Sequence, residues 1–245
     1  MREIRNIVIL TGAGISAESG LATFRGPEGL WEGHRVEDVA TPEAFARDPV
    51  LVHRFYDARR ANLARVEPNE AHRALARLDA LWPGELLIVT QNVDDLHERA
   101  GAKRLLHMHG ELKSGWCRAC DARMGWEVDM GGAELCPECG AAGAVRPDIV
   151  WFGEMPYEMD RIDRALMEAD LFVSIGTSGA VYPAAGFVQT ANYVGAKTLE
   201  MNLEPSLGAY HFQESRIGPA GVLVPTWVKE VLGGGNGALD NFRKK

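Results

Sequence analysis

The chain has 245 residues, of which 46% are hydrophobic and 24% are charged, and its formal net charge is −8. These proportions are typical of a globular protein with one large domain or two small ones. No uninterrupted apolar run reaches the roughly 18 residues of a membrane span, and the negative charge argues against general affinity for nucleic acid. We therefore expect neither membrane insertion nor stable nucleic-acid binding.

The chain opens with a nearly all-apolar stretch at residues 4–11 (IRNIVILT), which predicts a central parallel strand covered on both faces. Because this stretch follows the first residue so closely, we expect no targeting segment and a cytoplasmic location. Gly12, Gly14 and Ala17 come next and match the pattern G-x-G-x-x-A at a strand-to-helix turn. Glycines at strand ends are often only turns, but this placement favours a nucleotide phosphate site.

The usual dinucleotide-binding pattern continues with an acidic residue about 20 positions after the glycines. Here, residues 24–31 (FRGPEGLW) have the composition of a loop instead. Their glycines and proline are consistent with a mobile cover over a ligand. The sequence thus predicts a nucleotide site but not a standard dehydrogenase.

Further along the chain, short apolar runs alternate with helix-like stretches, as in βαβ units. This alternation predicts an α/β fold built on a Rossmann-like, doubly wound parallel sheet. The runs expected to be strands are residues 86–90, 171–175, 198–202 and 222–225. The stretches expected to be helices are residues 70–81, 159–169 and 183–194.

Two segments interrupt this alternation and are expected to pack together as a smaller domain. Residues 36–67 look helical, with Pro42 and Pro49 near helix starts, and residues 112–150 are rich in glycine and hold all the cysteines. The expected division is a large domain of residues 1–35, 68–111 and 151–232, a small domain of residues 36–67 and 112–150, and a flexible tail at residues 233–245.

The cysteines form two C-x-x-C pairs separated by fifteen residues: Cys117, Cys120, Cys136 and Cys139. Two such pairs can supply the four thiolates of a tetrahedral metal site. Two disulfides are an alternative, which the clustering and the absence of a signal peptide disfavour, and a redox motif would not need a second pair. The spacing predicts one structural zinc ion with no ligand position left for catalysis.

Three polar residues, Gln91, Asn92 and Asp94, directly follow the expected strand at residues 86–90. The carboxyl ends of buried strands are where α/β folds place their ligands. Helix capping by Asn92 or Asp94 is the alternative, but capping alone gives no reason for three polar groups together. We therefore favour a binding site at this position.

Two histidines, His107 and His109, stand two positions apart just before a glycine. In an extended segment this spacing directs their side chains to opposite faces. A lone histidine is more often structural, and only the neighbouring motifs favour a functional one. We expect one of the two to face the ligand cleft and the other to be structural.

In chain order, the motifs GAGISAESGLATFR, TQNVD, HMHG, the two C-x-x-C pairs, VRPDIVWFGE, GTS and NLE resemble the sirtuin family of NAD-dependent protein-lysine deacylases. The match covers about residues 1–232. The resemblance implies an enzyme that binds acylated lysines of proteins, consumes NAD as a co-substrate, and releases nicotinamide and O-acyl-ADP-ribose. Mono-ADP-ribosyl transfer on the same fold and a non-catalytic NAD-sensing module are the alternatives, and we expect a monomer.

The resemblance also implies roles for individual residues. His109 would be the catalytic base that takes a proton from the ribose hydroxyls, and Asn92 would belong to the catalytic set as well. The residues at 150–154 would pair in β fashion with the substrate backbone: Val150, Trp151, Phe152, Gly153 and Glu154. The residues that would contact NAD, between the two domains, are Gly12, Ala13, Gly14, Ser16, Ala17, Phe24, Arg25, Trp31, Gln91, Asn92, Val93, Asp94, Gly176, Thr177, Ser178, Asn202, Leu203, Glu204 and Ala220.

Tyr56 and Arg59 would share one face of a helix, where a phenol beside a guanidinium suits a carboxylate. The residues alone favour a solvated, arginine-rich helix. The Tyr-x-x-Arg pattern, however, resembles the sirtuin branch that removes succinyl, malonyl and glutaryl groups, and Ala40 would leave room for a longer acyl chain. The resemblance therefore predicts Tyr56 and Arg59 as substrate-binding residues for acidic acyl-lysines, besides acetyl-lysine.

Overall fold

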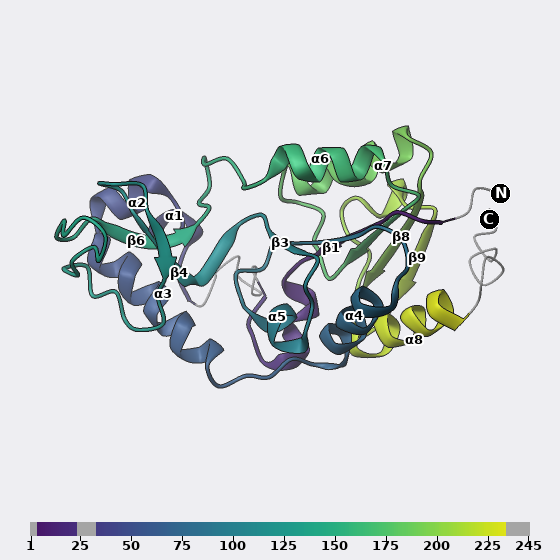
Figure 1. Cartoon of the computed structure of the whole chain (residues 1–245), viewed down its shortest axis with the longest axis horizontal. Coiled ribbons are helices and arrows are strands. Elements are labelled where there is room, and N and C mark those ends of the chain that lie inside the picture. Colours follow the sequence, from purple (N-terminus) through teal and green to yellow (C-terminus); the bar gives the residue numbers. More distant parts are fainter. Residues whose placement is uncertain (1–3, 24–32, 234–245) are drawn as a thin grey trace.

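The computed structural model describes residues 4–23 and 33–233, which form a large and a small region side by side (Figure 1). The loop expected as a mobile cover, with Phe24, Arg25 and Trp31, lies outside the described residues. So does the expected tail from residue 234 onward, whereas Gly233 ends the last helix. Within the described ranges, no helix is both long and apolar enough to cross a bilayer.

The large region is built on a six-stranded sheet in which all neighbouring strands are parallel. In their order across the sheet, the strands are β3 (Leu105–His107), β2 (Leu86–Thr90), β1 (Ile7–Thr11), β7 (Leu171–Ile175), β8 (Lys197–Asn202) and β9 (Glu214–Ile217). The chain extends outward from β1 in both directions, so the order reverses between β1 and β7. Ligands of open parallel sheets bind at the carboxyl ends of the strands at such a reversal.

Helices cover both faces of this sheet, which confirms the doubly wound α/β fold (Figure 1). One face lies under α4 (Glu70–Leu81) and α8 (Ala220–Gly233), and the other under α6 (Met159–Met167) and α7 (Phe187–Tyr193). A short helix, α5 (Leu96–Ala100), follows β2. The 3₁₀ helices of the described chain are η1 (Ala13–Ile15), η2 (Ala17–Ser19), η3 (Ala184–Gly186) and η4 (Ala209–His211).

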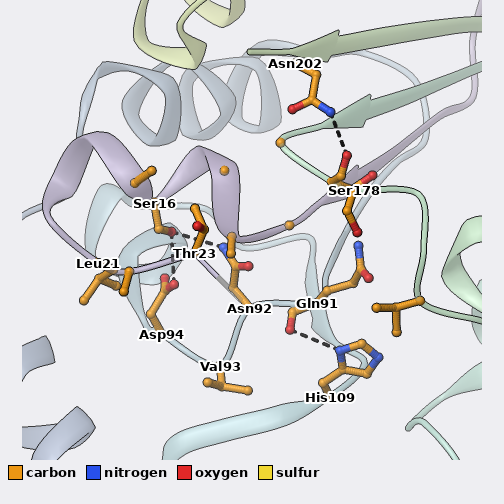
Figure 2. A pocket seen from close by; sticks show the side chains of 18 of the residues that line it. Ser16, Leu21, Thr23, Gln91, Asn92, Val93, Asp94, His109, Ser178 and Asn202 are labelled. Carbon is orange, nitrogen blue, oxygen red and sulfur yellow. Dashed lines mark hydrogen bonds between the residues drawn. The ribbon is translucent and has the colours of Figure 1, made fainter. Parts of the chain in front are cut away.

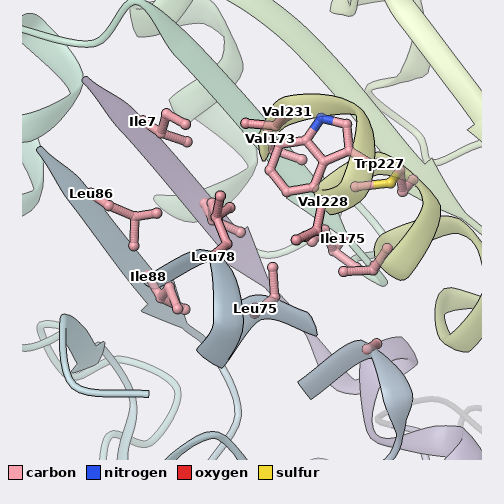
Figure 3. Close-up of a cluster of buried hydrophobic side chains, with 14 of the residues drawn as sticks. Ile7, Leu75, Leu78, Leu86, Ile88, Val173, Ile175, Trp227, Val228 and Val231 are labelled. Carbon is pink, nitrogen blue, oxygen red and sulfur yellow. The ribbon is translucent and has the colours of Figure 1, made fainter. Parts of the chain in front are cut away.

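The side chains of β1 alternate between two hydrophobic cores, as the period of a strand dictates. Ile7 and Ile9 pack toward α4 and α8, where Trp227 is fully buried (Figure 3). Val8 and Leu10 pack toward α6 and α7. Burial on both faces explains why this strand is apolar at every position.

The expected helix at residues 70–81 is confirmed as α4, and those at 159–169 and 183–194 correspond to α6 and to η3 with α7. The strand expected at residues 222–225 is wrong, because these residues lie in α8. A short apolar run cannot be assigned by periodicity alone. Here the buried residues Val224, Trp227, Val228 and Val231 recur at helical spacing and pack against the sheet.

The small region combines a three-stranded antiparallel sheet with helices that precede it in the chain. Pro42 and Pro49 stand at helix starts as expected, and the side chains of Thr41 and Asp48 cap those helices by accepting backbone N–H groups. The elements are α1 (Val36–Val39), α2 (Pro42–Arg47), α3 (Pro49–Leu63), β4 (Gly110–Cys117), β5 (Arg123–Gly125) and β6 (Val145–Ile149).

Candidate active site

A cavity of about 860 Å³ lies at the carboxyl ends of the parallel strands and extends to α3 of the small region (Figure 2). Every described residue that the sequence assigned to NAD, to the substrate or to catalysis lines this cavity. Phe24, Arg25 and Trp31 are the assigned residues that lie outside the described chain. The structure therefore brings together segments as far apart in the chain as Gly12 and Ala220.

Two glycine-containing turns interlock at the point where the strand order reverses. The N–H of Gly12 donates to the carbonyl of Ile175 (3.0 Å), and the N–H of Gly14 donates to that of Gly176 (2.9 Å). A Cβ on Gly14 would lie 2.7 Å from the Gly176 Cα, and Gly176 itself has a φ of +62°. These positions thus require glycine. The expected helix after the turn is replaced by the short helices η1 and η2.

The loops after β7 and β8, which carry the predicted NAD contacts at residues 176–178 and 202–204, hold each other. The Asn202 amide donates to the Thr177 carbonyl (2.6 Å), and the Gly176 N–H donates to the Met201 carbonyl (3.0 Å). The buried carboxylate of Glu200 accepts the Ser206 N–H (3.1 Å) and so holds the loop that contains Leu203 and Glu204. This wall of the cavity is therefore ordered by contacts within the protein.

A buried hydrogen-bond network lies behind the polar residues that follow β2 (Figure 2). The Ser16 hydroxyl donates to Asp94 Oδ2 (3.0 Å) and accepts from the Asn92 amide (3.1 Å). Burial raises the pKa of Asp94 above its ordinary value, although bonds from the Leu96 N–H and Ser16 oppose the shift. The network fixes the orientation of the Asn92 and Asp94 side chains, which line the cavity.

Two buried histidines that the sequence analysis did not identify extend this network. His72 Nδ1 accepts the Asn69 N–H (3.3 Å), its Nε2 lies 3.4 Å from Ser16 Oγ, and its ring packs edge-on against that of His97. Burial lowers the pKa of His72 to about 4 and that of His97 well below the ordinary value, so both are neutral at pH 7. The sequence signal that could have identified His72 is its position three residues after Asn69, in a helix-capping pattern.

His109 lines the cavity with one ring nitrogen already engaged (Figure 2). Its Nδ1 lies 3.2 Å from the Gln91 carbonyl oxygen, which can accept a hydrogen bond but cannot donate one. Nδ1 therefore carries the hydrogen, and Nε2 is left as the basic nitrogen. Burial lowers the pKa of His109, with the bond to Gln91 opposing the shift, so the ring is neutral and able to act as a base at pH 7.

His107 lies on the other side of its strand, as expected, and does not line the cavity. Its Nε2 lies 2.6 Å from the Glu98 carboxylate, and its Nδ1 lies 3.0 Å from the Asn92 carbonyl oxygen. Burial opposes the charge, but the Glu98 carboxylate raises the pKa of His107 overall. His107 thus supports the segment that follows β2 and does not face the ligand space.

Tyr56 and Arg59, both on α3, line the end of the cavity formed by the small region, together with Ala40. Tyr56 is fully buried, and burial raises its pKa to about 12, so its phenol stays protonated. The Trp151 indole Nε1–H donates to the Tyr56 oxygen (2.9 Å). Asn62 lines the cavity too and was missed, although it follows Arg59 at the same spacing of three.

The segment at residues 150–154 connects the two halves of the cavity. The Val150 N–H donates to the His109 carbonyl (2.9 Å), and the Phe152 N–H donates to the Ala40 carbonyl (3.0 Å). The Trp151 N–H donates to Glu154 Oε2 (2.8 Å). A substrate backbone that paired with this segment would therefore use its other backbone groups.

The four cysteines lie together at the outer end of the small region, with all their sulfur atoms within 4.8 Å of one another. The Sγ atoms of Cys117 and Cys139 are 3.8 Å apart, as are those of Cys120 and Cys136, and no disulfide forms among them. A tetrahedral zinc with Zn–S bonds of about 2.3 Å requires S···S distances of about 3.8 Å. The cluster therefore has the geometry of a four-thiolate zinc site.

Comparison with known proteins agrees with this site. A family model described as the Sir2 family matches residues 12–183. A protein from Bdellovibrio bacteriovorus named NAD-dependent protein deacylase is 57% identical over 234 residues, which cover 95% of this chain and 99% of that protein. A protein of the same name from Caulobacter vibrioides is 54% identical over 235 residues, with 95% and 99% covered.

Solved structures give the same result. A Sir2 homologue in complex with NAD has a TM-score of 0.84 at 39% identity and covers 92% of this chain and 88% of its own. A complex of Sir2 with a p53 peptide and NAD⁺ has a TM-score of 0.79 at 30% identity and covers 94% and 95%. The interlocked glycine turns, the cavity lined by His109 and the extent of these matches lead to one conclusion: the chain belongs to the Sir2 family.

Proposed function

We propose that this chain is an NAD-dependent protein deacylase that removes acyl groups from lysine side chains of proteins. One observation carries the proposal. A single cavity joins the glycine turns at the strand reversal, a neutral histidine with a basic Nε2, and a buried Tyr56 beside a half-buried Arg59 at the far end. The names of the relatives from Bdellovibrio and Caulobacter support the same activity.

NAD occupies the large-region half of the cavity in this proposal, and the acylated lysine enters from the small region. NAD is a co-substrate and supplies an anomeric carbon from which nicotinamide departs when the acyl oxygen adds. The turn at Gly12 and Gly14 lies at the carboxyl ends of the strands, where such sheets place phosphates. The division into domains at 1–35, 68–111 and 151–232 against 36–67 and 112–150 is part of the proposal, and the two separate sheets support it.

His109 acts as the general base. With Nδ1 donating to the Gln91 carbonyl, Nε2 would take a proton from a ribose hydroxyl of the bound co-substrate, and that oxygen would add to the acyl carbon. The electron pair would move onto the lysine nitrogen, and water would then release free lysine and O-acyl-ADP-ribose. The lowered pKa of His109 keeps this nitrogen unprotonated at pH 7. Asn92 and Asp94, held by Ser16, orient the ribose.

The acyl groups preferred by this site are acidic ones, such as succinyl or malonyl. Ala40 and the apolar wall around it leave space for the chain of such a group, but an unpaired carboxylate there would be costly. The Arg59 guanidinium and the Tyr56 hydroxyl, a turn apart on α3, supply the charge and the donors that a carboxylate needs.

A structural zinc ion completes the small region in this proposal. Cys117, Cys120, Cys136 and Cys139 would hold it, and the S···S distances of 3.8 Å support tetrahedral thiolate ligation. Four thiolates fill the coordination shell, so the metal does not take part in the reaction. The cytoplasmic location stays a prediction, and the four unpaired thiols suit a reducing compartment.

The test compares acetyl-lysine and succinyl-lysine forms of one peptide, each with and without NAD. We expect NAD-dependent loss of both acyl groups, higher catalytic efficiency on the succinyl peptide, and one nicotinamide released for each O-acyl-ADP-ribose formed. ADP-ribose attached to protein, with no deacylated peptide, would instead indicate mono-ADP-ribosyl transfer. Mass spectrometry of the peptide and of the nucleotide product separates these results.

A further inference from the structure

We propose that Trp151 is a positioning residue that determines the acyl preference by fixing the direction of the Tyr56 hydroxyl. The proposal rests on the acidic-acyl function given above and deepens it. Trp151 lies two positions beyond the end of β6, in the segment proposed to pair with the substrate backbone. Its side chain is 2% exposed and packs against the rings of Tyr56 and Phe45.

The hydrogen bond between Trp151 and Tyr56 can run in only one direction. The Trp151 indole Nε1–H lies 2.9 Å from the Tyr56 oxygen, and both atoms are buried. An indole nitrogen can only donate, so the Tyr56 oxygen must accept. A phenol that accepts through its oxygen directs its own proton to a different partner. Trp151 therefore orients the Tyr56 hydroxyl as a donor, which is what a carboxylate requires.

The indole is itself held in place on several sides. The Arg146 guanidinium lies 3.4 Å from the centre of the Trp151 ring and donates to both oxygens of Glu154 (2.7 and 3.0 Å). Glu154 Oε2 also accepts the Trp151 backbone N–H (2.8 Å). Phe45 packs on the ring as well, at 5.3 Å between centroids. Rotating the indole away from the Tyr56 oxygen would break its stacking on the Arg146 guanidinium, which the ion pair with Glu154 holds in place.

The direction of the Tyr56 hydroxyl matters only for substrates with a distal charge. With its pKa at about 12, Tyr56 is protonated at any physiological pH, so the hydroxyl has one proton to place. If the oxygen lone pairs faced the acyl carboxylate, the two would repel each other. An acetyl group ends before this position and carries no charge. The Trp151 bond should therefore affect acidic acyl groups selectively.

The variant Trp151→Phe removes the indole N–H but keeps an aromatic ring beneath Arg146. We expect the KM for the succinyl peptide to rise about tenfold, which is typical for losing one hydrogen bond to a charged group, and the ratio of succinyl to acetyl efficiency to fall by a similar factor. The matched control is His53→Leu, which changes the same aromatic cluster at a ring that packs on Phe45 (5.3 Å between centroids) rather than on Trp151. It should not change the ratio of the two efficiencies.

The double variant Trp151→Phe/Tyr56→Phe decides whether the two residues act as one unit. Because Trp151 acts through the Tyr56 hydroxyl, the double variant should lose no more succinyl efficiency than Tyr56→Phe alone. Equal losses on succinyl and acetyl peptides in Trp151→Phe, or additive losses in the double variant, would show that Trp151 only packs the core. A wild-type enzyme that does not process the succinyl peptide would instead overturn the acidic-acyl function itself.

A second measurement uses the wild-type fold and so does not depend on the stability of the variants. A carboxylate that accepts the Tyr56 proton polarises the phenol and strengthens the bond from the indole. The Trp151 indole N–H resonance should therefore shift when a succinyl-lysine peptide binds, and shift less with the acetyl form. A resonance that responds equally to both peptides would contradict the proposal.

Discussion

The two halves of the cavity are built in different ways. In the large region, its wall consists mainly of backbone at the ends of parallel strands, and the turns at Gly12, Gly14 and Gly176 interlock so closely that no side chain fits between them. Both faces of the sheet behind them are covered by hydrophobic cores. This half is suited to a ligand that never varies, such as the phosphates of NAD.

In the small region, the wall consists of side chains, some packed in a hydrophobic cluster and others held by polar contacts. Arg60 donates to the carbonyls of Leu112 (2.9 Å) and Val128 (3.2 Å), and Asp57 pairs with Arg60 and accepts the Met130 N–H (3.0 Å). These bonds hold α3, which carries Tyr56 and Arg59, against the cysteine cluster. The hydrophobic cluster around the cysteines is small.

The comparison teaches that the two halves should respond differently to mutation. Changes in the large region should impair the use of NAD with every acyl substrate. Changes in the small region should alter the choice of acyl group, unless they unfold that region as a whole. The following predictions test this separation, from the largest expected effect to the smallest.

The largest effect is expected at the histidine that both halves share. His109→Ala should lower turnover at least about 100-fold on acetyl and succinyl peptides alike, because no other base replaces Nε2. Folding should be nearly unchanged in a melting curve. His107→Ala is the matched control and should have a milder effect, since His107 bonds to Glu98 away from the cavity. Near-normal turnover of His109→Ala would refute the catalytic role.

Loss of the metal should destroy the part of the cavity that the small region forms. Cys136→Ala or chelation should unfold the small region and abolish activity on both substrates, because its cluster is too small to hold without the metal. Elemental analysis of the native protein should give about one zinc per chain. A metal-free protein that is stable and active would contradict this account.

Replacing Gly176 in the large region should impair the use of NAD without changing the acyl preference. A Cβ on Gly176 would lie 2.5 Å from the Ile15 nitrogen, and its φ is +62°. Gly176→Ala should therefore lower the free energy of unfolding by at least about 2 kcal/mol and raise the KM for NAD with both peptides equally. Gly125→Ala is the control, because its Cβ would meet nothing within 4 Å. A changed succinyl-to-acetyl ratio in Gly176→Ala would break the separation.

Arg59→Met should change the acyl preference without unfolding the small region. Removing one partner of a desolvated charge pair costs about 2–5 kcal/mol, so succinyl-lysine efficiency should fall at least about tenfold. Acetyl-lysine turnover should change little or improve, because that substrate has no distal charge. Tyr56→Phe should act in the same direction with a smaller effect. Equal losses on matched peptides would make Arg59 structural.

The effect with the least consequence at neutral pH is the pH dependence of stability in the large region. His72 has a pKa of about 4 in the folded chain against about 6.5 when unfolded, so its contribution is fully present above pH 6.5 and is lost as the pH falls toward 4. The loss should reach about 3 kcal/mol by pH 4. In denaturant titrations, the His72→Gln variant should have a lower free energy of unfolding than the wild type at pH 7. That free energy should also change less between pH 6.5 and pH 4. If the free energy of unfolding of the variant changed with pH as much as that of the wild type, His72 would not be the cause of the acid destabilisation.

Much of the fold could be predicted because its signals are local. The strands β1, β2 and β7 are short apolar runs, α4 has a clear helical period and a cap at Asn69, and the cysteine spacing indicates a metal site. The edge strand β9 (ESRI) is polar at three of its four positions and gave no such signal. The apolar start of α8 was misread as a strand because four residues are too few to establish a period.

What the sequence by itself determined, then, is the architecture, the family and the set of residues around the cavity. Only the tertiary structure decided how those residues are oriented. The tautomer of His109 depends on the Gln91 carbonyl, and the direction of the Tyr56 hydroxyl depends on Trp151, 95 positions away. The physical reason is that periodicity and spacing report which residues are buried, whereas a proton's position depends on the single partner that folding brings within hydrogen-bond distance.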